Sequence, residues 1–520
     1  MVPDPLSLVL SLAGTLDVCI RTGKKLVHLC QQIRSLGSDI EEMALIIEGV
    51  WNKMEIQVGL IKEFWNSSLL QPSLQKHYAD AILRLIKKLQ GAVSSLETSN
   101  EKRLSSSSVL AKVKAVYLMH VLKKIVADLE TWQRRFDPSW YLITLLSAPA
   151  IDERLQQQRS SPSASRLLRI RESIHHNSNC GANVDDSIFQ SFEGLSGQRD
   201  RIQGTNTYTS YYRGQKVLLD RTDYGPRAKP ETIKGHVRDM ARMLGYVDAD
   251  SFGLLKCLGA IEIHPQDSTG APRSIQYEYV LQISEGLSEP RTLRDVLLTQ
   301  PTLSLTKRLK LAKQLARSVM FVHTMGFVHK NIRPETVVIF EGHDAGIGPS
   351  FLVGFECIRY ELGQTDLMGD LEWQKNLYRH PHRQGLWTEE AYTMQHDIYS
   401  LGVCLLEIAL WHSFVICEPD KIEPHPWSGL KIQSLIAARN QRQDAMAIKE
   451  ELVTMTQGGI QSLVGDQYTQ IVLACLCCLD PNSEHNIFKK SRDDATIESG
   501  VRVGVRYIEK ILSKIEELSI

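Results

Sequence analysis

The fold of most of this chain is decided by one stretch, Phe321-Val322-His323-Thr324-Met325-Gly326-Phe327-Val328-His329-Lys330-Asn331-Ile332-Arg333-Pro334-Glu335-Thr336-Val337-Val338-Ile339. It follows a segment with apolar residues at helical spacing, which predicts an amphipathic helix from about Leu305. Upstream, short apolar or alternating runs predict strands at 216–220, 254–263 and 277–283, and a helix at 232–244. After Leu293 the pattern is mostly helical. Strands followed by helices predict an α+β class.

Three later segments follow this stretch in a fixed order. They are Phe351-Leu352-Val353-Gly354-Phe355-Glu356, Tyr378-Arg379-His380-Pro381 and Asp397-Ile398-Tyr399-Ser400-Leu401-Gly402-Val403. Together with His329–Thr336 they resemble the catalytic loop, D-F-G, A-P-E and central C-lobe helix of protein kinases. The resemblance implies a bilobal α+β protein-kinase-like fold over 205–520, with an N-lobe at about 205–287 and a C-lobe at about 288–520.

The kinase-like positions that carry phosphoryl transfer hold unsuitable residues. The base position has Asn331, an amide that takes no proton, and the second magnesium ligand is replaced by Thr336. The first residue of D-F-G, which supplies the principal magnesium carboxylate, is Gly354. Aligning the third strand puts Thr222 at the phosphate-binding lysine. Glu356 is the one candidate left for holding a cation.

Other features of the kinase pattern are absent or only structural. No G-x-G-x-x-G precedes the third strand. Asp239 is a candidate for the acid that pairs with the lysine. His329, Phe355 and Asp397 resemble residues that brace the catalytic loop rather than react.

The first 150 residues predict an all-α helical bundle. Apolar residues recur at helical spacing over 40–65, 77–96 and 109–132. Residues 5–14, the helix around Trp51 and the segment Trp132–Trp140 resemble fungal HeLo-type domains of the prion-inhibition and propagation group. In that group the bundle is paired with a degenerate kinase-like domain, an architecture similar to the mixed-lineage-kinase-like necroptosis effectors. Residues 151–204, with the polar run Gln156–Ser163, are predicted to be a linker and lead-in to the N-lobe.

The amino-acid composition limits the classes of partner and the kinds of structure expected for this chain. The 520 residues carry 60 Lys+Arg and 60 Asp+Glu, so no chain-wide basic field favours nucleic acid. The ten cysteines are too sparse for a disulfide scaffold, and Cys475, Cys477 and Cys478 are expected to be buried free thiols. The apolar stretch Leu6–Ile20 is preceded by Asp4 and is too short to span a bilayer, so neither a signal peptide nor a spanning helix is expected.

The resemblance implies a signalling or regulated-cell-death effector. In it, a catalytically inactive kinase-like domain acts as a binding switch on the bundle, which self-associates and engages membrane through residues 6–20. Two alternatives stay open: a divergent ATP-dependent Ser/Thr protein kinase, and a non-catalytic scaffold for protein partners. No cofactor is required in the first reading, although bound ATP and magnesium are compatible with it. The expected location is cytoplasmic, with recruitment to membrane on activation.

Overall fold

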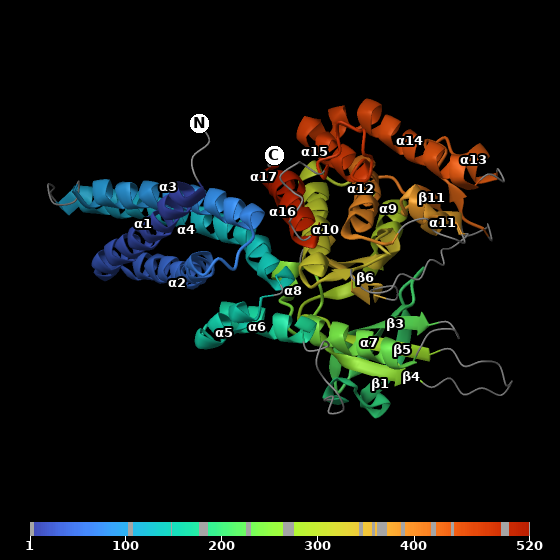
Figure 1. Ribbon diagram of the computed structural model, residues 1–520, viewed down its shortest axis with the longest axis horizontal. Helices are drawn as coiled ribbons and strands as arrows, with labels where there is room; N and C mark the ends of the chain where they lie inside the picture. Colours follow the sequence, from blue (N-terminus) through green and yellow to red (C-terminus); the bar gives the residue numbers. More distant parts are fainter. Residues whose placement is uncertain are drawn as a thin grey trace. The chain divides into compact units, whose positions relative to one another are not determined.

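The computed structural model describes residues 5–101, 108–146, 148–175, 186–224, 230–263, 275–342, 347–355, 359–360, 372–385, 391–417, 423–437, 441–489 and 499–518. The chain divides into two compact units (Figure 1). Unit 1 contains Met1–Glu172 and Ile497–Val505, and unit 2 contains Ser173–Thr496 and Arg506–Ile520. The multidomain prediction of a helical region followed by a mixed strand and helix region is therefore confirmed.

Unit 1 is built on four long helices, as the periodicity predicts. They are α1 (Pro5–Ile33), α2 (Ser38–Asn66), α3 (Pro72–Glu101) and α4 (Ser108–Tyr141). Helix α1 packs against α2 and α3, and α4 packs against the same two. Their apolar stripes meet in the interior, where a Cβ on Gly23 of α1 would lie 2.1 Å from the ring of Trp51 on α2. A glycine at 23 is thus what lets these two helices approach closely.

The segment 151–204, which we expected to be a linker, contains regular structure. Helices α5 (Pro149–Gln157) and α6 (Pro162–His175) occupy its first part, and the first strand of unit 2 begins at Leu195. Arg171 of α6 explains the order, because its fully buried guanidinium forms a bidentate pair with Asp152 at 2.6 and 3.1 Å. It also donates to the carbonyls of Ile143 (2.7 Å), Leu146 (2.6 Å) and Ala148 (3.2 Å). The buried role of Arg171 could not be predicted from the sequence, because the segment around it is polar in composition.

Unit 2 begins with a five-stranded antiparallel sheet in the order β1-β2-β3-β5-β4. The strands are β1 (Leu195–Arg201), β2 (Thr207–Tyr212), β3 (Gln215–Tyr224), β4 (Cys257–Ile263) and β5 (Ile275–Gln282). Helix α7 (Pro230–Gly245) packs on β4 and β5, and the short α8 (Ala249–Phe252) follows it. Alternation along the strands divides the sheet into two faces. One face carries a small apolar cluster of Tyr212, Val217, Leu219, Ile261 and Val280.

The rest of unit 2 is mainly helical. Its α-helices are α9 (Leu293–Thr299), α10 (Leu305–Thr324), α11 (Trp373–Asn376), α12 (Met394–Leu410), α13 (Gln433–Ala437), α14 (Gln441–Gly459), α15 (Gln461–Leu476), α16 (Ser499–Tyr507), which is shared with unit 1, and α17 (Ser513–Glu517) after a π-helical turn (Ile508–Leu512). Its strands are β6 (Ser288–Thr292), β7 (Phe327–Val328), β8 (Val337–Glu341), β9 (Ile347–Leu352), β10 (Arg359–Tyr360), β11 (Val415–Ile416) and β12 (His425–Pro426).

Helix α12 is the centre of this helical part. It is buried along almost its whole length and packs against α10 and α15. A Cβ on Gly402 would lie 2.7 Å from the Cβ of Cys475, so glycine allows the close crossing of α12 and α15. Cys475, Cys477 and Cys478 are buried free thiols, as predicted. Within the described part of the chain, no helix has the length and apolar content needed to cross a bilayer.

Candidate functional site

The loop after α10 is held in shape by one buried carboxylate. Asp397, in the first turn of α12, accepts hydrogen bonds from the backbone N–H groups of His329 (2.7 Å) and Lys330 (2.9 Å). The Nε2 of His323 (3.0 Å) and the hydroxyl of Tyr392 (2.8 Å) also contact it. Burial would raise the pKa of Asp397, but the hydrogen bond and charge of His323 and the contacts of His329 lower it. Lys330 adopts a φ of +66°, and the two bonds to Asp397 fix the tight turn at this residue.

His329 connects this loop to the chain after β9. Its fully buried ring places Nε2 3.0 Å from the carbonyl oxygen of Val353 and packs 5.3 Å from the ring of Phe355. The backbone N–H of Asn331 donates to its Nδ1 at 3.3 Å, which leaves Nε2 as the donor to Val353. Burial lowers the pKa of His329 to about 4. The ring is therefore neutral at physiological pH and braces the loop.

Asn331, at the expected base position, is used in local contacts. Its Oδ1 accepts a hydrogen bond from Nε of Arg333 at 3.0 Å, and its Nδ2 donates to the carbonyl of Gly354 at 3.5 Å. A carboxamide has no basic lone pair at neutral pH, so these contacts orient a polar group that cannot accept a substrate proton.

Gly354 and Thr336 fill the space where a metal-binding side chain would project. Gly354 has a φ of +82°, and a Cβ placed on it would lie 2.5 Å from the Cγ2 methyl of Thr336. The Thr336 hydroxyl is engaged within the loop, donating toward the carbonyls of Asn331 (2.8 Å) and Arg333 (2.9 Å). Neither residue presents a carboxylate. Glu356, the remaining cation candidate, lies outside the described residues.

Asp220 of β3 contacts the backbone at Gly354 and Phe355, and the sequence alone did not single it out. Its Oδ2 accepts from the backbone N–H groups of Gly354 (2.8 Å) and Phe355 (3.0 Å), and its Oδ1 accepts from the hydroxyl of Thr207 (3.3 Å). Thr222, two residues further along the same face, donates instead to the carbonyl of Tyr277 at 3.4 Å. The signal in the sequence was a lone acid ending the apolar run Val217-Leu218-Leu219-Asp220.

The surroundings of Asp220 are acidic as well as buried. Burial raises the pKa of Tyr279, and the charges of Tyr224, Cys257, Asp220 and Asp239 raise it further. Asp239, the acid expected to pair with a lysine, is thus close enough to act on the same tyrosine, and it is itself 2 % exposed. Two buried carboxylates, Asp220 and Asp239, therefore lie near the Tyr279 hydroxyl.

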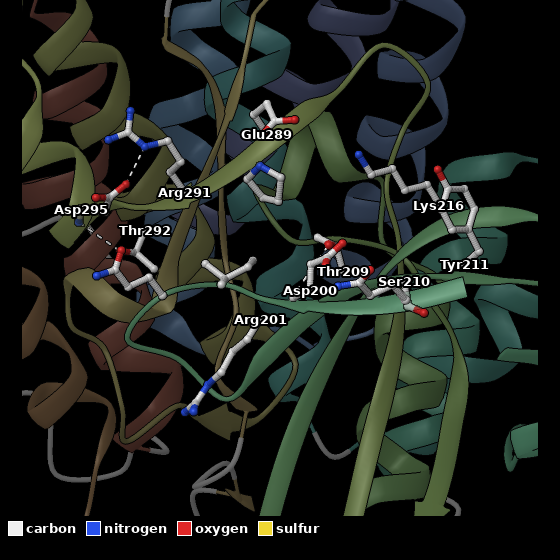
Figure 2. A pocket seen from close by; sticks show the side chains of 14 residues that line it. Asp200, Arg201, Thr209, Ser210, Tyr211, Lys216, Glu289, Arg291, Thr292 and Asp295 are labelled. Carbon is white, nitrogen blue, oxygen red and sulfur yellow. Dashed lines mark hydrogen bonds and ion pairs between the residues drawn. The ribbon is translucent and has the colours of Figure 1, made fainter. Parts of the chain in front are cut away.

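Unit 2 also contains a cavity of about 490 Å³ between β1–β2 and β6–α9. Figure 2 shows Asp200, Thr209, Tyr211 and Lys216 lining it from the sheet, and Arg291, Thr292 and Asp295 from the opposite side. Arg291 is tied to Asp295 at 2.5 Å. Lys216 of β3 also lines this cavity. Since the bordering charges are of both signs, the cavity has no concentrated positive field for a triphosphate.

A second buried network, centred on Arg294, supports the loop that follows α10. Arg294 of α9 contacts Glu335 (3.2 Å), Glu407 (3.2 Å) and the hydroxyl of Tyr378 (2.8 Å). Burial would lower the pKa of Arg294, but Glu335, Tyr378 and Glu407 raise it, so it stays charged. Burial raises the pKa of Glu407 to about 7, although Arg294 opposes this. Burial would also raise the pKa of Glu335, yet Arg294 and Arg333 lower it. Arg294 thus stabilises one loop acid and one helix acid together.

Metal ligation finds little support in this geometry. Over the described ranges, no cluster of three or more His, Cys, Asp and Glu side chains is arranged to hold an ion. The structure brings together five of the residues singled out in the sequence: His329, Asn331, Gly354, Phe355 and Asp397. Asp220 and the Arg294 network are additions from the structure.

Comparison with known proteins adds one distant relative. The chain is 27 % identical over 139 residues to a protein of Dictyostelium discoideum named as a probable serine/threonine-protein kinase. The match covers 27 % of this chain and 8 % of that relative. No protein-family model matches the chain. The relative therefore links part of the chain to a kinase-like sequence, while most of that protein has no counterpart in the match.

Proposed function

We propose that unit 2 is a catalytically inactive protein-kinase-like domain, a pseudokinase, that acts as a binding switch. The observation that carries the proposal is the Asp220 carboxylate, which caps the backbone N–H groups of Gly354 and Phe355. A kinase needs a cation near the D-F-G position, here Gly354 and Phe355, to neutralise the phosphate that is transferred. A carboxylate there repels phosphate.

Two requirements of phosphoryl transfer fail together. A proton acceptor is replaced by the amide of Asn331, and the D-F-G carboxylate by Gly354. Because the methyl group of Thr336 fills the space beside Gly354, no side chain can be accommodated there without repacking. These residues do not fit bound Mg²⁺ and ATP. Their contacts are those of a braced scaffold, which suits binding and switching.

We further propose that unit 1 is the output of the switch, a bundle that self-associates and engages membrane. The stretch 6–20 lies in α1, where Leu16 and Cys19 are buried. The side chains of Leu16 and Cys19 become available only if α1 leaves its partners α2 and α3. The mechanism therefore needs two states of the bundle and a ligand, partner or modification that binds one of them better. The HeLo-like sequence features support this role.

A divergent ATP-dependent Ser/Thr kinase is the second candidate, and the kinase-named relative favours it. A scaffold that binds proteins through both units, with neither nucleotide nor membrane, is the third. Transfer of labelled phosphate from ATP separates the first two candidates. We expect no incorporation above background into the chain or a general acceptor protein. Magnesium-dependent incorporation that is lost in Asn331→Ala or Glu356→Ala would establish the kinase and overturn the pseudokinase proposal.

Membrane engagement separates the switch from the scaffold. Under the switch proposal, full-length protein releases dye from anionic phospholipid vesicles once α1 is destabilised, for example by Leu16→Asp. The matched exposed-site control Gly14→Asp lies on the same helix, where an added Cβ meets nothing within 4 Å. Release by neither protein, with both folded by circular dichroism, would leave the scaffold.

A further inference from the structure

The bundle carries a basic groove between α3 and α4. The groove has a volume of about 530 Å³ and is lined by Lys87, Lys88, His120, Lys124 and Tyr117, among others. Lys88 is neutralised by Asp128 at 2.6 Å. Among the described residues, Lys87 and Lys124 have no anionic partner, and both are exposed. The groove thus presents two unpaired positive charges.

The rim of this groove is apolar. Tyr117, which lines the groove from α4, is 52 % exposed. Large apolar side chains of this exposure at the edge of a cavity mark interaction surfaces. The floor is also apolar, with Ala92, Val121, Ile125 and Leu129 between the helices. A fitting occupant therefore combines an apolar side chain with negative charge.

The first three turns of α2 have that combination. Glu41, Glu42 and Leu45 are all exposed, and Leu45 is 50 % exposed. Neither glutamate has an ion-pair partner within the part of the chain that the structure describes. A helix N-terminus favours acidic residues through its dipole, which accounts for Glu41 in the first turn. The dipole does not account for Leu45, an exposed leucine next to two glutamates that have no ion-pair partner among the described residues.

The acidic face and the basic groove of one chain cannot meet each other. Helix α2 packs against α1 and α4, whereas the groove opens between α4 and α3 on another side of the bundle. We propose that the α3–α4 groove of one chain receives the Glu41–Glu42–Leu45 face of a second copy. Because the two surfaces differ, the contact is heterologous, so it propagates into rings or filaments rather than closing as a symmetric dimer. The inference rests on the self-association proposed above and gives it a surface.

Charge reversal on full-length protein tests the contact. The groove variant is Lys87→Glu with Lys124→Glu, the face variant is Glu41→Lys with Glu42→Lys, and the swap variant combines all four. Lys76→Glu is the control, an exposed lysine on α3 away from the groove. We expect sedimentation velocity to show association weakened at least about tenfold in each double variant, since like charges then face each other. The swap variant recovers it, and Lys76→Glu matches wild type.

Zero-length carbodiimide cross-linking of mixed ¹⁴N and ¹⁵N chains detects even weak association. The expected products are mixed-isotope cross-links joining Lys87 or Lys124 to Glu41 or Glu42. Association that persists in both double variants would overturn this surface while leaving self-association intact. A chain that gives no mixed-isotope cross-link, both as wild type and with α1 destabilised by Leu16→Asp, would overturn both. Neither result bears on the pseudokinase assignment, which the phosphate-transfer assay decides separately.

Discussion

A Cβ atom added to Gly354 would lie 2.5 Å from the Cγ2 methyl group of Thr336. The two residues come from segments 18 positions apart, and each occupies a position where the kinase pattern places a magnesium ligand. The absence of a side chain at Gly354 leaves room for the methyl group of Thr336. Under the proposed pseudokinase assignment, restoring a single magnesium ligand would therefore not restore phosphoryl transfer.

This packing predicts the cost of a side chain at 354. Gly354→Ala should destabilise the protein by about 2–4 kcal/mol, from the positive φ and from overpacking against Thr336. The same change in a Thr336→Ser background should cost about 1 kcal/mol less, because serine keeps the hydroxyl and lacks the methyl group. Urea unfolding of the four proteins in a double-mutant cycle measures the difference. Equal costs in both backgrounds would show that the methyl group is not the obstacle.

The buried His329 predicts a pH dependence. The pKa of His329 in the folded state is about 4, below its unfolded value of 6.5. The unfolded chain thus takes up a proton first as pH falls, and stability is lost between about pH 6.5 and pH 4, by up to about 3 kcal/mol. His329→Gln keeps a donor and does not titrate. Its free energy of unfolding should fall less steeply than that of wild type over this range, although other buried histidines still contribute.

Parallel slopes for wild type and His329→Gln would contradict a neutral buried imidazole at this position.

The two acids on Arg294 predict opposite responses to the same substitution. Burial raises the folded pKa of Glu407 to about 7, above its ordinary value of 4.5, so its contribution is full below about pH 4.5 and is lost as pH rises through 7. Glu335 has a lowered pKa and contributes above about pH 4.5. Thermal unfolding should therefore show Glu407→Gln flattening the decline between pH 5 and pH 8. Glu335→Gln should lower Tm throughout that range.

If Glu335→Gln were neutral at pH 8 while Glu407→Gln lowered Tm there, the assignment of the two acids would be reversed.

Arg171 predicts how unit 1 holds α5 and α6. Arg171→Met leaves Asp152 and three carbonyl groups without their donor, so it should cost about 3–5 kcal/mol. Arg159→Met, at an exposed arginine in the turn between the two helices, should change stability by less than about 0.5 kcal/mol. Chemical denaturation gives both values, and limited proteolysis should show cleavage near 158–161 only in Arg171→Met. A small effect of Arg171→Met would mean that these helices dock through apolar contacts alone.

Sequence patterns predict two kinds of feature. They predict helices whose apolar residues recur at regular spacing, and they predict the loop whose residues form a recognisable motif. The stripes of α2, α3 and α4 follow from spacing, and Asp397 with His329 follows from a motif whose residues contact each other. Asp220 escaped prediction because its role depends on the backbone of Gly354 and Phe355, over 130 residues away. Arg171 escaped because one buried arginine in a polar stretch gives no periodic signal. The Arg294 network likewise joins residues more than 100 positions apart.

The central claim is that the cleft of unit 2 lacks the groups that bind magnesium and ATP. A thermal-shift titration of the full-length protein with ATP, with and without magnesium, tests it most directly. AMP serves as the control for binding through the base and ribose alone. The account predicts no shift in Tm that depends on magnesium up to millimolar ATP. A saturable rise in Tm that requires magnesium and exceeds that with AMP would contradict it.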